Sequence, residues 1–299
     1  MTCARKIEVL HDAADLVGES PLWDSERNVL WWVDIACRAV RRRDFASGVV
    51  SSLETPFIPG ALALDEDRHV NIAGGMGLYR ITECGSFETI GEAPGSSSSM
   101  RMNDGAVDHA GRFWVGTVPL TPQPVPVGAL YRFGSDGVLE AVDGLRTQNG
   151  TAISPDGATF YVADSHPDLR VIWAYDFDVE AGVLENRRVF HQVSRGRPDG
   201  AAVDADGCYW FAAIDAGLII RLDPLGREME AIPLPVSRPT NLAFYGTDLS
   251  ALAVTTMSVG TQGEKLAGCL LTLPSGVRGW PQPRLALGHT GARKEMRAH

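Results

Sequence analysis

Short hydrophobic runs alternate with clusters of Gly, Pro, Asp and Ser along the whole chain, whereas the spacing typical of amphipathic helices is scarce. Runs of this length between turn residues predict β-strands. One pattern recurs: a turn containing Asp or Gly precedes a hydrophobic strand that ends in a small or polar residue. Its six copies lie at residues 24–34, 65–75, 108–117, 154–164, 204–213 and 246–255.

The spacing of these copies predicts the fold class. Six repeats of roughly 40–50 residues indicate an all-β protein, a six-bladed β-propeller. A β-sandwich or two separate β domains are the alternatives. In the propeller, residues 1–288 form a single domain and residues 289–299 a disordered tail. Residues 6–12 and 283–287 are expected to be strands that close the first and last blades together.

Composition narrows the choice of partners. The 299 residues include 27 Lys and Arg against 37 Asp and Glu, a formal net charge of −10. Binding to phosphates needs clustered Lys and Arg, so we expect neither nucleic acid nor a membrane surface as a partner. This charge suits a cation or a neutral small molecule. The basic run formed by Arg38 and residues 41–43 is expected to be a solvated face.

Cysteine usage and hydropathy indicate the compartment. The five cysteines are far apart and odd in number, which argues against a disulfide framework. The N-terminal segment lacks the hydrophobic stretch of a signal peptide, and no run approaches the ~18 apolar residues of a membrane helix. We therefore expect a cytoplasmic protein.

One position in each repeat lies just before the hydrophobic strand that we expect to line the central channel. Ten to twelve residues before each hydrophobic centre stand Glu19, Gly60, Asn103, Asn149, Asp199 and the pair Thr240–Asn241. Equivalent positions in a ring of blades converge at one end of the axis, so Glu19, Asn103, Asn149 and Asp199 are predicted to meet. Two carboxylates and two amide oxygens are donors that hard cations such as Ca²⁺, Mg²⁺ or Mn²⁺ prefer.

Other interpretations of this register remain open. Asn-Gly and Asp-Gly are common turn sequences, so any one of them is explained by chain reversal alone, whereas their recurrence favours a site. The glycines that follow, Gly105, Gly150 and Gly200, permit unusual backbone angles and close approach. No His or Cys falls at this register, which argues against a structural zinc site. Ser20 and Ser165 lack the G-x-S-x-G turn of a serine hydrolase.

The segments around these positions resemble those of the gluconolactonase, regucalcin and senescence-marker-protein family of six-bladed propeller lactonases. The matching segments are 18–23 (GESPLW), 101–117 (RMNDGAVDHAGRFWVGT), 128–133 (GALYRF), 148–165 (QNGTAISPDGATFYVADS), 197–210 (RPDGAAVDADGCYW) and 238–244 (RPTNLAF). By position, the resemblance implies that Glu19, Asn149 and Asp199 bind one divalent metal ion and that Asp199 is the general base. It also implies that Asn103 and Arg101 contact the sugar.

Two further residues are candidates for the pocket. Gln148 is a candidate for a hydrogen bond to the substrate, and His166 follows the fourth repeat, where it can reach the pocket mouth. One stretch departs from the family: where some relatives have an acidic residue that touches the sugar, residues 116–128 contain none. This Pro-rich loop is expected to reshape the pocket and leaves the substrate preference open.

The predicted function is hydrolysis of a sugar-acid lactone to the free acid. The metal polarises the lactone carbonyl, and Asp199 or a water on the metal supplies the nucleophile. Candidate substrates are glucono-, xylono-, arabinono- and galactonolactone, which belong to carbohydrate metabolism. Ca²⁺ is the first choice of metal, with Mg²⁺, Mn²⁺, Zn²⁺ or Fe²⁺ as alternatives. A non-catalytic calcium-binding regulatory propeller and a propeller esterase or phosphotriesterase are the competing functions.

Overall fold

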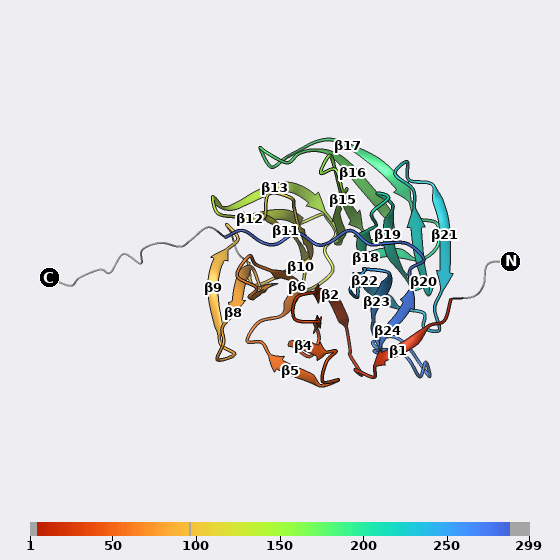
Figure 1. Cartoon of the computed structure of the whole chain (residues 1–299). Coiled ribbons are helices and arrows are strands. Elements are labelled where there is room, and N and C mark those ends of the chain that lie inside the picture. The colour runs from red at the N-terminus through yellow and green to blue at the C-terminus, as the bar shows by residue number, and fades with distance from the viewer. Residues whose placement is uncertain (1–4, 96, 288–299) are drawn as a thin grey trace.

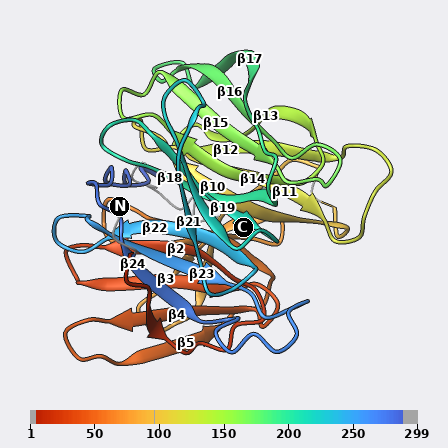
Figure 2. The ribbon, with the colours of Figure 1, turned by 90° about the vertical axis from the view of Figure 1, so that its right-hand side faces the viewer.

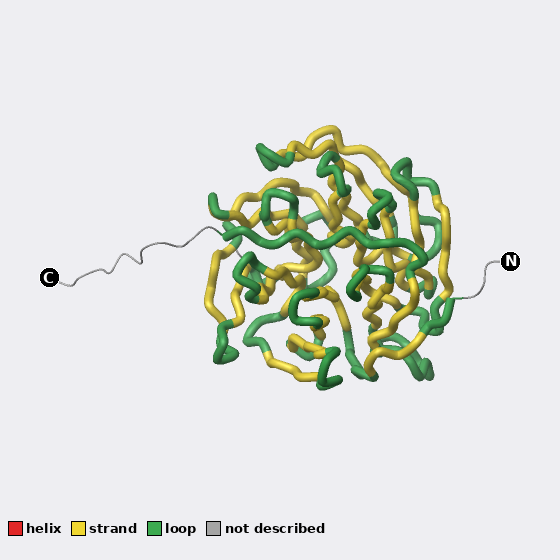
Figure 3. Tube along the Cα trace, viewed as in Figure 1, coloured by secondary structure: helices red, strands yellow, loops and turns green. Residues whose placement is uncertain are grey.

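The computed structural model describes residues 5–95 and 97–287. Within these ranges the chain contains 24 β-strands and no helix, and the strands form six four-stranded sheets. Figure 1 shows the sheets arranged around a common axis as the blades of a propeller, and Figure 3 shows the loops that join their strands. The predicted six-bladed β-propeller is confirmed. The predicted tail at 289–299 lies outside the described residues.

Each blade contributes one strand to each of four layers around the axis. The inner strands are β2 (Gly18–Asp24), β6 (Pro59–Leu64), β10 (Met100–Val107), β14 (Gln148–Ile153), β18 (Arg197–Val203) and β22 (Pro239–Tyr245). The second strands are β3 (Val29–Asp34), β7 (Val70–Gly74), β11 (Phe113–Pro119), β15 (Thr159–Asp164), β19 (Tyr209–Ile214) and β23 (Ala251–Thr256). The third strands are β4 (Ala39–Asp44), β8 (Gly77–Ile81), β12 (Gly128–Gly134), β16 (Val171–Asp178), β20 (Leu218–Leu222) and β24 (Leu270–Pro274). The outer strands are β5 (Val50–Glu54), β9 (Phe87–Glu92), β13 (Gly137–Leu145), β17 (Val183–Gln192), β21 (Glu228–Pro233) and β1 (Glu8–His11). The side view in Figure 2 shows β2 to β5 following one another outward.

The hydrophobic centres of the repeats lie on the second strands, which corrects the expectation that they line the channel. Trp32, Trp114 and Trp210 are fully buried there and pack between neighbouring blades. The inner strands β6 and β14 are buried at every position as well. Both layers are therefore covered on both sides, although an inner strand such as β14 (QNGTAI) also buries polar residues. The strand that lines the channel is therefore the one that begins at the predicted site residues.

The recurring Asp turn joins each inner strand to its second strand. Asp108 Oδ1 accepts a hydrogen bond from the amide of Arg112 at 3.0 Å, and its Oδ2 accepts one from Trp114 Nε1 at 2.7 Å. Asp204 Oδ2 accepts the equivalent bond from Trp210 Nε1 at 2.8 Å. In these two blades a buried carboxylate thus holds the turn and also fixes the tryptophan of the following strand.

The N-terminal strand closes the ring. β1 pairs with β24 of the last blade in antiparallel fashion, with Glu8 opposite Thr272, so the strand predicted within 6–12 is confirmed. The prediction for residues 283–287 was wrong. Leu285 makes only an isolated parallel bridge to Asp65 and belongs to no blade. Pro283 and the nearby Pro281 lack the amide hydrogens that a strand ladder requires.

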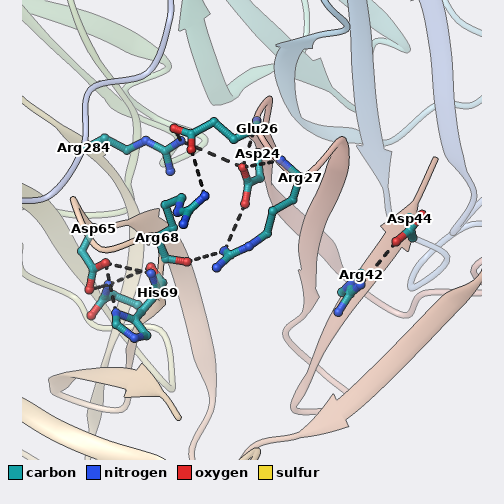
Figure 4. Close-up of polar contacts among 10 residues, drawn as sticks. Asp24, Glu26, Arg27, Arg42, Asp44, Asp65, Arg68, His69 and Arg284 are labelled. Atoms are coloured by element: carbon teal, nitrogen blue, oxygen red, sulfur yellow. Dashed lines mark hydrogen bonds and ion pairs between the residues drawn. The ribbon is translucent and has the colours of Figure 1, made fainter. Parts of the chain in front are cut away.

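Residues 278–287, here called the C-terminal strap, instead cross the end of the channel opposite the predicted site (Figure 1). The amide of Trp280 donates to the carbonyl of Val203 at 3.1 Å, and the amide of Leu285 donates to the carbonyl of Leu64 at 2.8 Å. Figure 4 shows Arg284 beside Glu26, with Nη2 and Oε1 3.4 Å apart. The strap therefore ties the fifth blade to the first two. No helix in the described part of the chain is long and hydrophobic enough to span a membrane.

Candidate active site

Every inner strand carries a β-bulge at the register of the predicted site residues. In β2, Glu19 pairs with Val33 and Leu22 pairs with Trp31, so β2 has one more residue than β3 between these pairs. The other five bulges lie between Pro59 and Ala61, Met102 and Gly105, Asn149 and Ala152, Pro198 and Ala201, and Pro239 and Asn241. A bulge leaves one residue outside the ladder and re-aims its side chain. These six bulges explain why polar side chains of this register meet between blades.

Asn241 on β22 joins carboxylates from two other blades. Its Nδ2 donates to Glu19 Oε2 at 2.9 Å and to Asp104 Oδ1 at 3.2 Å. Glu19 Oε2 also accepts the amide of Ser20 at 3.0 Å, and Asp104 Oδ2 accepts the amide of Thr151 at 2.8 Å. Since Glu19, Asp104 and Asn241 are all buried, this network fixes blades one, three and six relative to one another at the axis.

Asn103 and Asn149 form a second link between blades. Asn103 Nδ2 donates to Asn149 Oδ1 at 2.7 Å, and Arg101 Nη1 donates to Asn103 Oδ1 at 2.7 Å. Asn149 Nδ2 donates to Ser165 Oγ at 2.8 Å, and the Ser165 hydroxyl donates to the carbonyl of Pro198. Because its nitrogen is engaged with Ser165, Asn149 presents its oxygen to Asn103. That oxygen keeps a lone pair for a further partner.

Asp199 on β18 is the site carboxylate with the fewest partners. Only 6% of the residue is exposed, and no described residue donates a hydrogen bond to its carboxylate. Burial raises its pKa well above the ordinary value, and the charges of Glu19 and Asp104 raise it further, while Arg197 lowers it in part.

The other charged groups of the site are perturbed for related reasons. Burial, reinforced by the charge of Asp104, raises the pKa of Glu19 to about 7. Burial also raises the pKa of Asp104 to about 6 and lowers the pKa of Arg101 to about 10. When ionised, Glu19 and Asp199 are attracted by the half-buried guanidinium of Arg101, and Asp199 also by Arg197. Asp104 adds a third buried carboxylate to the same cluster.

Two further predicted pocket residues border this cluster, and the carbonyl of one of them, Gln148, accepts a hydrogen bond from Asn103 Nδ2 at 2.7 Å. Gln148 is fully buried, and its Nε2 donates to Thr151 Oγ1 at 2.6 Å. Its side chain packs against Gly116, where an added β-carbon would come within 2.0 Å of it. His166 lies in the loop after β15, on the face that carries the site, with Nδ1 3.4 Å from Arg146 Nη1. Contact of either residue with a substrate stays a prediction.

Sequence reasoning missed three residues that hold the others in place: Asp104, Asn241 and Ser165. Asp104 follows Asn103 directly, and Asn241 stands at the repeat register beside Thr240. The register was therefore the signal for both, but it does not tell which of two adjacent residues points between the blades. Ser165 carries no such signal, because a serine after a strand is common in turns.

The chain matches the family described as SMP-30/Gluconolactonase/LRE-like region over residues 17–258. The protein belongs to this family, as predicted. It is 35% identical over 278 residues to a 6-deoxy-6-sulfogluconolactonase of Pseudomonas putida, covering 91% of this chain and 95% of the relative. It is 31% identical to the regucalcin of Danio rerio, covering 92% and 97%. A relative from Haloferax volcanii, 30% identical over 86% of each chain, is a pentonolactonase. The expectation of a lactonase-type enzyme agrees with these relatives.

Solved structures support the same family. A calcium-binding regucalcin of Agrobacterium tumefaciens superimposes with a TM-score of 0.88 at 26% identity, covering 95% of this chain and 98% of that one. A gluconolactonase of Xanthomonas campestris superimposes with a TM-score of 0.75 at 25% identity, covering 90% and 89%.

The donor set of the site fits a hard divalent cation. Glu19, Asn149 and Asp199 offer carboxylate and amide oxygens, which Ca²⁺ and Mg²⁺ prefer. Among the described residues no group of three or more His, Cys, Asp or Glu side chains is arranged to hold a metal ion.

Proposed function

We propose that the protein is a metal-dependent hydrolase that opens a sugar-acid lactone to the free acid. The observation that supports this most is the surplus of buried carboxylates, Glu19, Asp104 and Asp199, at the inner-strand bulges. It occurs in a family whose relatives include enzymes named for sulfogluconolactone and pentonolactone. Aldonolactones are accordingly the proposed substrate class.

In the proposed mechanism a divalent cation held by Glu19, Asn149 and Asp199 would polarise the lactone carbonyl and stabilise negative charge on its oxygen. Asp199 takes a proton from the attacking water, and the cation would assist this step by lowering the pKa of that water. The water oxygen bonds to the carbonyl carbon, the bond from that carbon to the ring oxygen breaks, and the ring oxygen leaves with the proton as a hydroxyl. Arg101 and Asn103 orient the sugar hydroxyls.

A lactone panel tests this proposal. After chelation the protein is assayed on glucono-, xylono-, arabinono- and galactonolactone, with Ca²⁺, Mg²⁺, Mn²⁺, Zn²⁺ or Fe²⁺ restored one at a time. We expect chelation to abolish turnover and one metal to restore it, with Ca²⁺ the first choice. Asp199→Asn should lower kcat by at least about 100-fold, whereas Asp168→Asn, an exposed site on the same face, should not. A protein that holds metal and opens none of these lactones contradicts the proposal.

A non-catalytic calcium-binding propeller is the second candidate, because several relatives are named regucalcin. Calcium binding without turnover of any lactone would indicate it. Aryl esters and phosphotriesters added to the same panel test the competing esterase function by relative kcat/KM. A cytoplasmic location remains part of the proposal and is testable by fractionation.

A further inference from the structure

A hollow of about 370 Å³ opens beside Arg101 on the face that carries the site. Its wall includes Arg38, Phe57, Ser97, Ser98, Arg101 and Leu120. Such a volume lies within the range of small-molecule pockets. Arg101 belongs both to this hollow and to the site, where it donates to Asn103 Oδ1 at 2.7 Å. A ligand that contacts Arg101 from the site therefore extends into the hollow.

The charge of this hollow is opposite to that of the chain. Two arginines line it and no acidic residue does, although the net charge of the protein is −10. The segment 116–128, which contributes Leu120 to the wall, also contains no Asp or Glu. A positive concave surface on an acidic protein attracts a negatively charged group.

Arg38 is free to bind such a group, unlike the arginines that follow it. Arg41 Nε lies 2.6 Å from Asp15 Oδ1, and Arg42 Nη2 lies 3.4 Å from Asp44 Oδ2. Among the described residues, none forms an ion pair or hydrogen bond with the guanidinium of Arg38. In this run Arg41 and Arg42 thus pair with carboxylates, Arg43 lies over the ring of Phe45, and Arg38 faces a hollow.

The backbone of Arg38 is held although its side chain is exposed. Its carbonyl accepts hydrogen bonds from the amide of Thr55 at 2.7 Å and from Thr55 Oγ1 at 3.1 Å, and Thr55 is itself buried. The residue has a φ of 49°, a left-handed conformation that costs free energy for a residue with a β-carbon. The fold therefore fixes the point from which this guanidinium projects.

We infer that this hollow binds an anionic group on the substrate, at the end remote from the reacting carbonyl, with Arg38 as its principal contact. The inference rests on the proposed lactonase function and specifies its substrate as a lactone bearing a sulfonate, phosphate or carboxylate. A guanidinium donates paired N–H bonds to the oxygens of such groups. The hydroxyls of Ser97 and Ser98 supply further donors at the same wall.

The test compares gluconolactone with three lactones of the same ring, which carry a 6-phosphate, a 6-sulfonate or a 6-carboxylate. The metal-loaded protein is expected to prefer at least one anionic lactone by about 10-fold or more in kcat/KM, and the three arms identify the group. Arg38→Gln should remove about 10-fold of that preference through KM, with kcat/KM for gluconolactone within twofold of its original value. Arg38→Lys should restore part of the preference for the anionic lactone, and added salt should weaken that preference.

Arg170→Gln is the matched control, because Arg170 is also exposed, also left-handed (φ 46°) and on the same face, but lines a different hollow.

Equal kcat/KM for neutral and anionic lactones would overturn the inference, and so would equal effects of the Arg38 and Arg170 variants. If no lactone is opened, the proposed function fails on its own account. Calorimetric binding of 6-phosphogluconate against gluconate then still tests the hollow: tighter binding that needs Arg38 supports it, and equal binding overturns it.

Discussion

Replacing Gly200 by alanine is expected to destabilise the protein through Asn241 on the next blade. A β-carbon on Gly200 would lie 1.9 Å from the Asn241 Cγ atom, so the amide group has to move away. It then loses its hydrogen bonds to Glu19 Oε2 and Asp104 Oδ1. Two buried carboxylates are left with one donor fewer each.

The size of the effect follows from these two bonds. Hydrogen bonds to charged groups contribute about 1.5–3 kcal/mol each, and each carboxylate retains one backbone amide donor. We therefore expect Asn241→Ala to lower the free energy of unfolding by about 3 kcal/mol, and Gly200→Ala to lower it by at least as much. In the double variant the lost amide vacates the space that the new methyl group needs. Its stability should then lie within about 0.5 kcal/mol of Asn241→Ala alone.

Urea unfolding followed by tryptophan fluorescence measures all three variants. The measurement belongs at pH 8 with a chelator, above the pKa values of about 7 for Glu19 and about 6 for Asp104. Gly91→Ala on the outer strand β9 is the control, because its β-carbon meets only side chains, the nearest being Val138 Cγ2 at 3.1 Å. If the double variant loses the sum of the two single effects, about 6 kcal/mol, the two residues act independently and the reasoning is refuted.

Three further measurements test other parts of the molecule. Hydrogen bonds from neighbouring hydroxyls lower the pKa of Cys84 to about 7, whereas a hydrogen bond to a carboxylate raises the pKa of Cys37. Iodoacetamide at pH 7 should therefore alkylate Cys84 faster than Cys37, as measured by peptide mass spectrometry, and equal rates would contradict this. Leu285 of the strap is fully buried, so Leu285→Ala should lower the free energy of unfolding in urea by about 2–4 kcal/mol. An unchanged midpoint would mean that the strap does not pack there. Burial raises the pKa of Asp15 to about 6, so the folded state holds this proton more tightly than the unfolded chain and stability falls as pH rises from about 4 to about 6. Asp15→Asn should gain up to about 3 kcal/mol relative to the unsubstituted protein across that window, and a constant difference would be the contrary result.

The number of blades was predictable because each blade needs a strand buried on both faces. Such a strand is continuously hydrophobic, and the six copies stand out against the turn residues around them. Their radial order was not predictable, because inner and second strands are both buried and burial alone does not rank them. The strap was misread for a related reason. A run such as 283–287 is hydrophobic because Leu285 is covered, whether or not its backbone joins a ladder.

The repeat register made the positions of the site residues predictable, but not all of their partners. The bulge occurs once in every inner strand, so Glu19 and Asn149 stand at equivalent places, and their meeting at one metal ion stays a prediction. Their partners depend on finer detail. In β22 the bulge falls between Pro239 and Asn241, and it is Asn241 that reaches Glu19, 222 residues away in sequence. A one-residue change in the position of a bulge exchanges the side chain that points between blades.

Total charge governs long-range attraction, whereas recognition depends on the groups that line a site. The site has two parts of opposite sign: buried carboxylates such as Asp199 at the end of the channel, and the guanidiniums of Arg38 and Arg101 in the adjoining hollow. An anionic substituent is repelled by the first part and attracted by the second. Under the proposed function, a lactone that carries one would therefore enter in a single orientation, with its carbonyl toward Asp199. A neutral lactone lacks this constraint, so its productive orientation has to be selected by hydroxyl contacts alone.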